Sequence, residues 1–390
     1  MKPESTLIFI LLFAILLLLS IIVGLLWNIQ KANKPPVPNR TAQTSGDSPL
    51  LEAGNVDGEE AEADKNELKF LEKIKECYRI DGKNLKMLEI IEERKLFVLL
   101  KGRLTLVGNS SEHKKGFVDV MIKKATNPKD QMQRMLINLE LVHLCDSSKH
   151  PNLLELKGFI EENGHYSIVT EYPEGGNLLD YVRRIKKNGK FKNQLSNSGY
   201  SKTEMMHDTP LEKLCTLDLL SITWQILNGM MEMAKNPFYH RQLSLSNIFI
   251  TANKTVKIGN FSLTRTNGHN EYYKKNTEWE MLISHRAPET FTDGRFTRQS
   301  DVWSFGVLLF ELFSLGEVPY QGQKDILKFV KRGGHLEKPK YCHLELYQLM
   351  TECWNLEQFK RPTFEKIQAE FEKHLEKYDI KLISEKSVQK

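Results

Sequence analysis

The sequence has little of what marks secreted, metal-binding or nucleic-acid-binding proteins. Its 390 residues include only five cysteines, which are scattered, odd in number and without the spacing of metal ligands. We therefore expect reduced thiols in a cytosolic domain. The formal net charge is +5 at pH 7, and no dense basic stripe with interleaved aromatic residues is present, so we expect no binding of nucleic acid. The sequence has no internal repeats, and its length suits a globular unit of two lobes with appendages.

Charge is absent from residues 7–27, a run made mostly of Leu, Ile, Phe and Val. About 20 apolar residues are what a helix needs to cross the hydrocarbon layer, so this run predicts a transmembrane helix. The alternative is a cleaved signal peptide, but its apolar core is typically about 7–15 residues long and ends at small residues. Lys31, Lys34 and Arg40 follow the run, whereas Lys2 precedes it. By the positive-inside rule, we expect a single-pass membrane protein with residues 1–6 outside and a cytoplasmic domain after the span.

Residues 28–67 are rich in Pro, Ser, Gly, Ala, Glu and Asp and contain few large apolar side chains. This composition predicts a disordered juxtamembrane linker. Apolar periodicity begins near Leu68 with the spacing of a short amphipathic helix. This helix leads into a globular domain predicted over residues 68–376, and residues 377–390 form a predicted C-terminal tail.

Short motifs follow one another in a definite order within this domain. In its first half, residues 120–123 read VMIK on a predicted strand, residues 131–144 have helical periodicity, and residues 150–153 read HPNL. The motifs of the second half are HRQLSLSN at 240–247, IGNFSL at 258–263, RAPE at 286–289, DVWSFGV at 301–307 and RPTF at 361–364. Each motif alone is a weak signal, but several independent motifs in this order are specific.

This series resembles the kinase domain of receptor protein tyrosine kinases, in particular the fibroblast growth factor receptor class, over about residues 85–375. The resemblance implies an α+β, bilobal protein-kinase fold, with a small β-rich lobe followed by a large helical lobe. It also implies a site for ATP and magnesium between the lobes. In such a site Lys123 takes the position that pairs the α- and β-phosphates, Thr170 is the gatekeeper, and Asn247 is a magnesium ligand.

Several residues that the family uses for phosphoryl transfer are replaced in this sequence. The catalytic base, an Asp in the family, is Gln242, whose amide cannot take a proton near neutral pH. The Asp that binds magnesium is Asn260, which lacks the charge that holds this hard cation. The family's three glycines let the backbone approach the phosphates, and Glu92, Arg94 and Phe97 are aligned with them.

Two further departures concern the ATP site. The Glu that orients the lysine in the family is aligned with Asn138, and Glu140 is placed on a different face of the helix, so we expect Lys123 to lack a partner. The family's alanine above the adenine ring and leucine below it are Met121 and Phe249 here. Because both are larger and protein interiors are close-packed, we expect them to fill the adenine slot.

The resemblance also assigns structural roles to residues that this sequence retains. In the family, an Asp carboxylate accepts hydrogen bonds from the backbone of the His-Arg pair, and the Glu of the Ala-Pro-Glu motif pairs with the Arg of the last motif. The retained residues are His240, Arg241, Phe261, Glu289, Asp301 and Arg361. The architecture is therefore expected to persist where the catalytic groups do not.

Each of two segments is open to two interpretations. Residues 186–212 are polar and lie where growth-factor receptor kinases carry a kinase insert. For this segment we favour a disordered surface loop over a phosphorylated docking site at Tyr200. Tyr272 and Tyr273 precede two lysines in the predicted activation segment. They are either phosphorylation sites of the receptor kinase type or incidental tyrosines of an exposed loop.

The sequence therefore predicts a membrane-anchored pseudokinase that acts as a scaffold or allosteric regulator, with other protein kinases or adaptor proteins as partners. The lost groups supply most of the positioning and charge on which phosphoryl transfer depends. We expect no cofactor, or ATP and magnesium at reduced affinity. One alternative is an active tyrosine kinase that works through Lys123 and Asn247, with Gln242 orienting the acceptor hydroxyl. Another is a secreted protein with disulfides.

Overall fold

The computed structural model describes residues 78–106, 116–146, 149–196, 199–201, 211–235, 238–266, 282–292 and 294–380. All of them belong to one of the two compact units of the chain, Ala63–Lys390. Within these described ranges, no helix is both long enough and apolar enough to cross a membrane. The predicted transmembrane helix, the linker, the predicted helix near Leu68 and most of the C-terminal tail lie outside the described residues.

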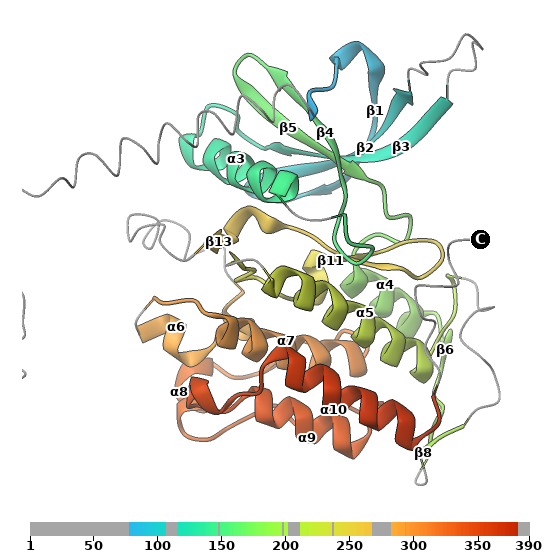
Figure 1. Ribbon diagram of the computed structural model, residues 1–390, viewed down its shortest axis with the longest axis vertical. Coiled ribbons are helices and arrows are strands. Elements are labelled where there is room, and N and C mark those ends of the chain that lie inside the picture. Colours follow the sequence, from blue (N-terminus) through green and yellow to red (C-terminus); the bar gives the residue numbers. More distant parts are fainter. Residues whose placement is uncertain are drawn as a thin grey trace, which may run out of the picture. The chain divides into compact units, whose positions relative to one another are not determined.

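The small lobe is built on an antiparallel sheet of five strands in the order β1-β2-β3-β5-β4 (Figure 1). Side chains alternate between the two faces of each strand. On β3, Val120 and Ile122 are fully buried in the core of this lobe, whereas Met121 and Lys123 belong to the opposite face, which lies towards the large lobe. The strands are β1 (Leu85–Glu93), β2 (Phe97–Leu106), β3 (Gly116–Ala125), β4 (Leu156–Glu162) and β5 (His165–Glu171).

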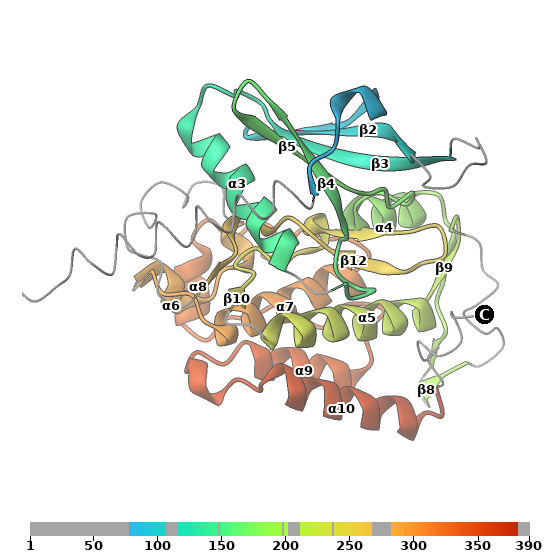
Figure 2. The ribbon, with the colours of Figure 1, turned by 45° about the horizontal axis from the view of Figure 1, so that its top comes forward.

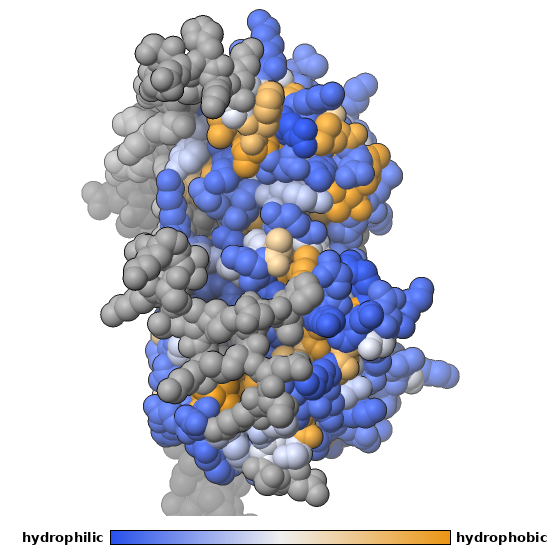
Figure 3. All heavy atoms as spheres, turned by 90° about the vertical axis from the view of Figure 1, so that its right-hand side faces the viewer, coloured by the Kyte–Doolittle hydropathy of each residue, from blue (hydrophilic) through white to orange (hydrophobic). Residues whose placement is uncertain are grey.

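The edge strand β1 exposes several large apolar side chains. Exposed fractions are 39% for Met87, 43% for Leu88, 61% for Ile90 and 41% for Ile91. Two irregularities in the pairing with β2 fall at Leu88 and Ile91, so the alternation that would turn apolar residues inward is interrupted. Figure 3 shows apolar side chains at the surface of the small lobe. Apolar groups gathered on a surface are typical of regions that contact other proteins.

Helix α3, Gln131–Asp146, connects the two lobes. It lies beside the sheet of the small lobe (Figure 2). Ile137, Leu141 and Leu144 on this helix belong to the same buried cluster as the core of the large lobe. The helix also contacts the short 3-10 turn Phe261–Leu263, which follows Asn260. The position of α3 is therefore tied to both halves of the candidate site.

The large lobe is arranged around α7, Arg298–Phe313, whose side chains are buried on nearly every face. A capping box sets its start. The Thr297 hydroxyl accepts from the Ser300 backbone N–H, and the Ser300 hydroxyl accepts from the Thr297 backbone N–H. Helices α5, α9 and α10 pack in layers with it (Figures 1 and 2). The other helices are α4 (Leu178–Lys187), α5 (Thr216–Ala234), α6 (Pro288–Thr292), α8 (Ile326–Lys331), α9 (Leu344–Cys353) and α10 (Phe364–Lys377).

The predicted insert, residues 186–212, is folded where the structure describes it, so the prediction of a disordered loop is wrong for those residues. Strand β6 (Phe191–Lys192) pairs with β9 (Leu214–Cys215), and β7 (Leu195–Ser196) pairs with β8 (Gly199–Tyr200). The hydroxyl of Tyr200 is 2.9 Å from Nε2 of His374 on α10, 174 positions further along the chain. The local composition is polar, and the contacts that order the segment come from distant residues, which a local pattern does not reveal.

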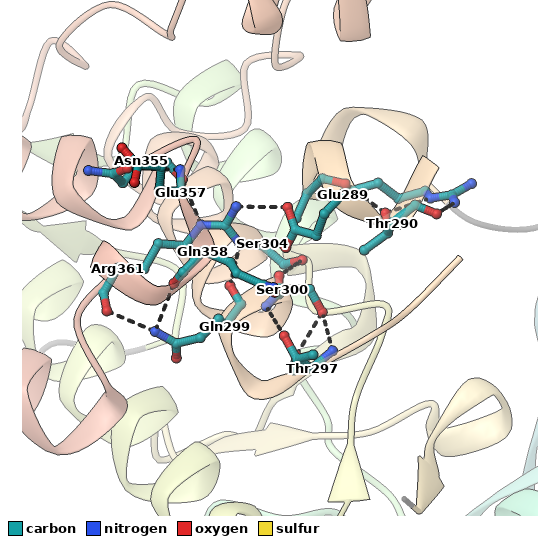
Figure 4. A network of polar contacts seen from close by, with 12 residues as sticks. Glu289, Thr290, Thr297, Gln299, Ser300, Ser304, Asn355, Glu357, Gln358 and Arg361 are labelled. Carbon is teal, nitrogen blue, oxygen red and sulfur yellow. Dashed lines mark hydrogen bonds and ion pairs between the residues drawn. The ribbon is translucent and has the colours of Figure 1, made fainter. Parts of the chain in front are cut away.

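A buried ion pair joins α6 to the end of the large lobe (Figure 4). The side chain of Arg361 is completely buried, and two of its guanidinium nitrogens donate to the two carboxylate oxygens of Glu289 at 2.7 and 2.8 Å. The same guanidinium also donates to the backbone oxygens of Gln299 and Asn355, each at 2.8 Å. A planar guanidinium can satisfy all of these acceptors at once, so the ion pair fixes three separate segments.

We predict that Arg361→Met lowers the free energy of unfolding by about 3–5 kcal/mol, because the Glu289 carboxylate and two backbone oxygens then lose their donor inside the protein. The measurement is urea denaturation followed by circular dichroism. The matched control is Lys360→Met, which breaks the exposed ion pair between Lys360 and Glu357 and should change stability by less than about 0.5 kcal/mol. Equal effects of the two substitutions would contradict this role of Arg361.

Candidate functional site

The ammonium of Lys123 lies inside the protein and has a carboxylate partner. Its Nζ is 2.5 Å from Oε2 of Glu140 on α3, and both side chains are less than 10% exposed. The prediction that Lys123 lacks a partner is therefore wrong. Asn138, which the alignment placed opposite the lysine, instead lines a cavity on another side of α3 with Arg134 and His165. A register error of two positions rotates a helical side chain by about 200°, which is why the choice between residues 138 and 140 decides the pairing.

Two further groups complete the surroundings of the ammonium. Lys123 Nζ donates to Oδ1 of Asn260 at 2.7 Å, and it lies 4.0 Å from the ring centre of Phe97. An ammonium has three N–H donors, and these contacts with Glu140, Asn260 and the Phe97 ring engage all of them. Burial lowers the pKa of Lys123, and the charge of Glu140 opposes this effect. A phosphate could reach the ammonium only by displacing one of these groups.

Gln242, Asn247 and Asn260 form a network of amides below this lysine. Lys123 can only donate, so the oxygen of Asn260 must face it and the amide nitrogen must face away. That nitrogen donates to Oδ1 of Asn247 at 2.9 Å and to Oε1 of Gln242 at 3.3 Å. Asn247 in turn donates to the backbone oxygen of Gln242 at 2.7 Å. The side-chain oxygen of Asn260 thus accepts from Lys123, and those of Asn247 and Gln242 accept from Asn260. These are the oxygens that a cation would need as ligands.

The backbone at Asn260 places its amide in this network. Asn260 has φ 61° and ψ 62°, a left-handed conformation that Asn tolerates better than most residues. The next residue, Phe261, donates its backbone N–H to Oε1 of Glu140 at 3.3 Å. One carboxylate thus binds Lys123 through one oxygen and the Phe261 backbone through the other. This carboxylate couples the small lobe to the segment that carries Asn260.

The loop that carries Gln242 is held by a buried carboxylate. Asp301 accepts from the backbone N–H of His240 at 2.8 Å and of Arg241 at 2.9 Å. Arg241 has φ 65°, a conformation that costs roughly 1–2 kcal/mol for a residue with a Cβ. These two hydrogen bonds stabilise the strained turn. Burial raises the pKa of Asp301 to about 6, although the two N–H donors favour the charged form.

His240 is fully buried beside this turn and is held as a neutral imidazole. Its Nδ1 accepts from the backbone N–H of Gln242 at 3.3 Å, and its Nε2 lies 3.1 Å from the backbone oxygen of Gly259. One nitrogen accepts and the other donates, which suits the neutral form. Burial lowers the pKa of His240 to about 4. The ring also packs edge-on against Phe261, with centroids 5.6 Å apart.

The space between Met121 and Phe249 is closed. These two residues form one buried cluster with Leu99 and Leu154, and the gatekeeper Thr170 is buried beside them, with its hydroxyl 3.4 Å from the backbone oxygen of Met121. The cavity that remains there has a volume of about 20 Å³, which admits little more than one water molecule. A purine does not fit this slot in the conformation described.

The hairpin between β1 and β2 carries Glu92, Arg94 and Phe97, which the resemblance aligns with the family's three glycines. Arg94 forms an ion pair with Glu92 at 2.6 Å, and it also donates to the backbone oxygen of Ser246 at 3.4 Å. Phe97, the third of these residues, covers the Lys123 ammonium. The hairpin thus contacts the loop of the large lobe directly. These side chains, rather than a glycine backbone, border the region where phosphates bind in the family.

Open space is present elsewhere between the lobes, under α3. A cavity of about 220 Å³ is bordered by Lys123, Gln242 and Asn260 on one side and by Met132 and Leu136 of α3 on the other. Leu263 and Leu282 also border it, and Tyr272 and Tyr273 lie outside the described residues. The amide network borders this cavity without offering it a carboxylate. Magnesium ATP therefore does not fit the residues present at this site.

The fold and the order of these positions define a protein kinase. Residues 97–371 match the family of protein tyrosine and serine/threonine kinases, and the chain belongs to this family. Its similar proteins include receptor tyrosine kinases and fibroblast growth factor receptors. This agrees with the resemblance seen in the sequence.

Three relatives illustrate the similarity. The chain is 31% identical to the tyrosine-protein kinase receptor ver-3 of Caenorhabditis elegans. The alignment is 413 residues long and covers 96% of this chain and 33% of that protein. It is 34% identical to the receptor-like tyrosine-protein kinase kin-15 of the same organism, over 66% of this chain and 57% of that protein. It is 31% identical to a fibroblast growth factor receptor of Halocynthia roretzi, over 76% of this chain and 39% of that protein. The chain thus spans between a third and somewhat over half of these relatives.

We predict that His240 makes the protein lose stability on acidification. The unfolded chain protonates this histidine below about pH 6.5, whereas the folded protein resists protonation until about pH 4. Between these values the unfolded state binds more protons, so the free energy of unfolding decreases as the pH is lowered. His240→Phe lacks this contribution. The stability difference between wild type and variant should shrink by about 3 kcal/mol from pH 6.5 to pH 4.

The measurement is urea denaturation of both proteins at a series of pH values. The opposite contribution of Asp301, whose carboxyl has a raised pKa in the folded state, is present in both proteins and cancels in the difference. Parallel stability curves for wild type and His240→Phe would contradict the assignment of a neutral, buried His240.

Proposed function

We propose that this chain is a membrane-anchored pseudokinase of the receptor tyrosine kinase class, which acts by binding other proteins. The observation that carries the proposal is the hydrogen bonding of Asn260, whose amide nitrogen donates to the side-chain oxygens of Asn247 and Gln242. In the family, a carboxylate at the position of Asn260 and the Asn at the position of Asn247 hold magnesium together. In this chain the side-chain amides of Asn260 and Asn247 are hydrogen-bonded to each other instead.

The chemistry of the substituted groups supports an inactive site. Gln242 can orient a hydroxyl but cannot accept its proton. Magnesium is bound mainly through carboxylates and phosphates, and neither Asn260 nor Asn247 supplies a charge. Removing a single preorganised oxyanion-hole donor from an enzyme typically costs about 10²–10³ in rate, and this site lacks both a general base and a carboxylate for the metal.

The retained contacts support a protein-binding role for the intact fold. Asp301 and Arg361 keep their buried partners, so the large lobe presents a kinase surface without needing the catalytic groups. The exposed apolar side chains of β1 support contact with another protein. The partners would be protein kinases, which the fold would regulate allosterically, or adaptor proteins. The membrane anchor of this proposal is residues 7–27, with the kinase fold in the cytoplasm.

One observation favours a second candidate function, an active protein tyrosine kinase. Lys123 and Glu140 form the buried ion pair that active kinases need in place. In this alternative, nucleotide binding displaces Asn260 and Phe97 from the ammonium and opens the slot between Met121 and Phe249. Gln242 then orients the acceptor hydroxyl without taking its proton.

We predict that ATP with magnesium does not change the thermal unfolding midpoint of the full-length chain, because Met121 and Phe249 fill the adenine slot. A ligand that binds only the folded state at a hundred times its dissociation constant would stabilise it by about 2.7 kcal/mol. The measurement is thermal denaturation with nucleotide in large excess. The positive control is Met121→Ala with Phe249→Leu, which restores the family's smaller residues and should gain a nucleotide-dependent rise.

Each pattern of midpoint shifts has a distinct meaning. A rise of the wild-type midpoint that needs magnesium would overturn the proposal in favour of the active kinase. A rise with ATP alone would mean that the fold senses nucleotide, which also contradicts a filled slot.

We predict that restoring both carboxylates, Gln242→Asp with Asn260→Asp, produces no measurable phosphate transfer while the slot stays closed. Combining this pair with Met121→Ala and Phe249→Leu should produce transfer, because base, metal ligand and purine site are then all present. The assay is transfer of the labelled γ-phosphate to a tyrosine-containing peptide. A gain of several powers of ten from the two carboxylates alone would show that the wild-type slot opens.

The wild-type chain is tested beside Lys123→Met in the same assay. Activity of the wild type that disappears in Lys123→Met would establish the active kinase. Equal background in both proteins is the result expected of a pseudokinase.

A further inference from the structure

Two histidines and a glutamate meet at the base of the large lobe, away from the kinase site. His343 is the N-cap of α9, Glu345 lies in its first turn, and His374 lies in the last turn of α10. Nδ1 of His374 is 2.8 Å from Oε2 of Glu345, and Nδ1 of His343 is 3.9 Å from the same oxygen. One ligand atom from each of the three residues lies within 4.8 Å of the others.

These separations are close to those of a tetrahedral zinc site. Zinc binds imidazole nitrogen and carboxylate oxygen at about 2.0–2.2 Å, which sets the ligand atoms of a tetrahedral site about 3.4 Å apart. The contact of His374 with Glu345 is shorter than this value and that of His343 is longer. To surround one ion, the two histidines must also approach each other, since the three ligand atoms lie within 4.8 Å. Nδ1 of His343 must exchange the hydrogen bond that it accepts from the Glu345 backbone N–H, at 3.3 Å, for the ion. Two imidazoles with one carboxylate are a ligand set that zinc prefers.

Each histidine has a hydrogen-bond partner behind it. Nε2 of His343 is 3.1 Å from the hydroxyl of Tyr378, and Nε2 of His374 is 2.9 Å from the hydroxyl of Tyr200. Metal-bound histidines almost always bind such a partner through the other ring nitrogen, which fixes the ring and its tautomer. Both Nδ1 atoms are thereby directed to the side of Glu345. This outer shell brings together the insert, α10 and the residue that follows α10.

The charge of the cluster also suits a cation. The Glu345 carboxylate accepts hydrogen bonds from Lys377 and His374. Lys377 is the ion-pair partner of this carboxylate, and its side chain is 58% exposed. A dication could take its place while the lysine moves into water.

The cluster is accessible from solvent. A groove with a volume of about 610 Å³ runs between α9 and α10, and Glu345, His374 and Lys377 line one part of it. Helices α9 and α10 lie side by side, and β8 lies near the end of α10 (Figures 1 and 2). An ion can therefore reach the cluster without opening of the fold.

We propose that His343, Glu345 and His374 bind Zn²⁺, with water as the fourth ligand. The ion would fasten the start of α9 to the end of α10. Through the hydrogen bond between His374 and Tyr200 it would also hold the insert against the lobe. The insert packs tightly there, since a Cβ added at Gly199 would lie 2.6 Å from the ring of Tyr378. This site requires neither nucleotide nor catalysis, so it stands independently of the function proposed above.

The test is zinc binding to the full-length chain, measured by equilibrium dialysis with zinc chloride and by the thermal midpoint with and without a chelator. We expect one zinc ion per chain and a midpoint that rises with zinc and falls back with chelator. Glu345→Gln and His374→Gln should weaken binding at least 100-fold. Tyr378→Phe, which removes only the hydroxyl behind His343, should weaken it about 10-fold, the smaller loss typical of outer-shell partners.

Two further variants separate a metal site from general effects on folding. Lys377→Met removes the cation that competes for Glu345 and should bind zinc several-fold more tightly, a result that a purely structural cluster would not produce. His165→Gln changes a histidine of the small lobe and should leave binding unchanged. The metal-free form of each variant is checked by circular dichroism for a native fold. Zinc binding that survives both Glu345→Gln and His374→Gln, or no binding at micromolar zinc, would overturn the proposal.

Discussion

The buried ammonium of Lys123 is the charge around which the junction of the two lobes is organised. Moving an unpaired charge out of water is very unfavourable, so Glu140 must stay within reach and α3 must stay against the sheet. The other oxygen of Glu140 binds the backbone of Phe261, which orients the segment that carries Asn260. Asn260 then accepts a hydrogen bond from Lys123. The ion pair thus holds a strand, a helix and a loop from different parts of the chain in one arrangement.

The sequence was sufficient for the order of the elements and for the contacts that a motif specifies. The strand ending in Lys123 and the helix after it follow from local patterns, because burial and period are visible in neighbouring residues. The partner of Lys123 was missed, because the register of α3 depends on the turn at residues 126–130 and not on the helix itself. An acidic residue facing the sheet in a mostly apolar helix was the available signal, and Glu140 matches it. Contacts between side chains that are far apart in the sequence are harder to predict.

The amide network illustrates this limit. Two substitutions and one retained residue are readable in the sequence: the lost base at Gln242, the lost metal ligand at Asn260 and the retained ligand Asn247. Their hydrogen bonds to one another depend on backbone geometry, such as the left-handed conformation of Asn260. The order of the insert depends likewise on Tyr200 and His374, which lie 174 positions apart. In each case the deciding contact lies between residues that no local pattern connects.

Closure of the lobes has a consequence for recognition. In this chain Arg94 reaches the loop of the large lobe, Asn260 binds Lys123, and Met121 packs with Phe249, so the two lobes contact each other directly through these side chains. A partner that recognises this closed shape finds it already formed. It therefore bears less of the entropy cost of ordering the surface it binds. Under the function proposed above, the fraction of chains in complex would depend on the partner's concentration relative to its dissociation constant, and not on the concentration of ATP.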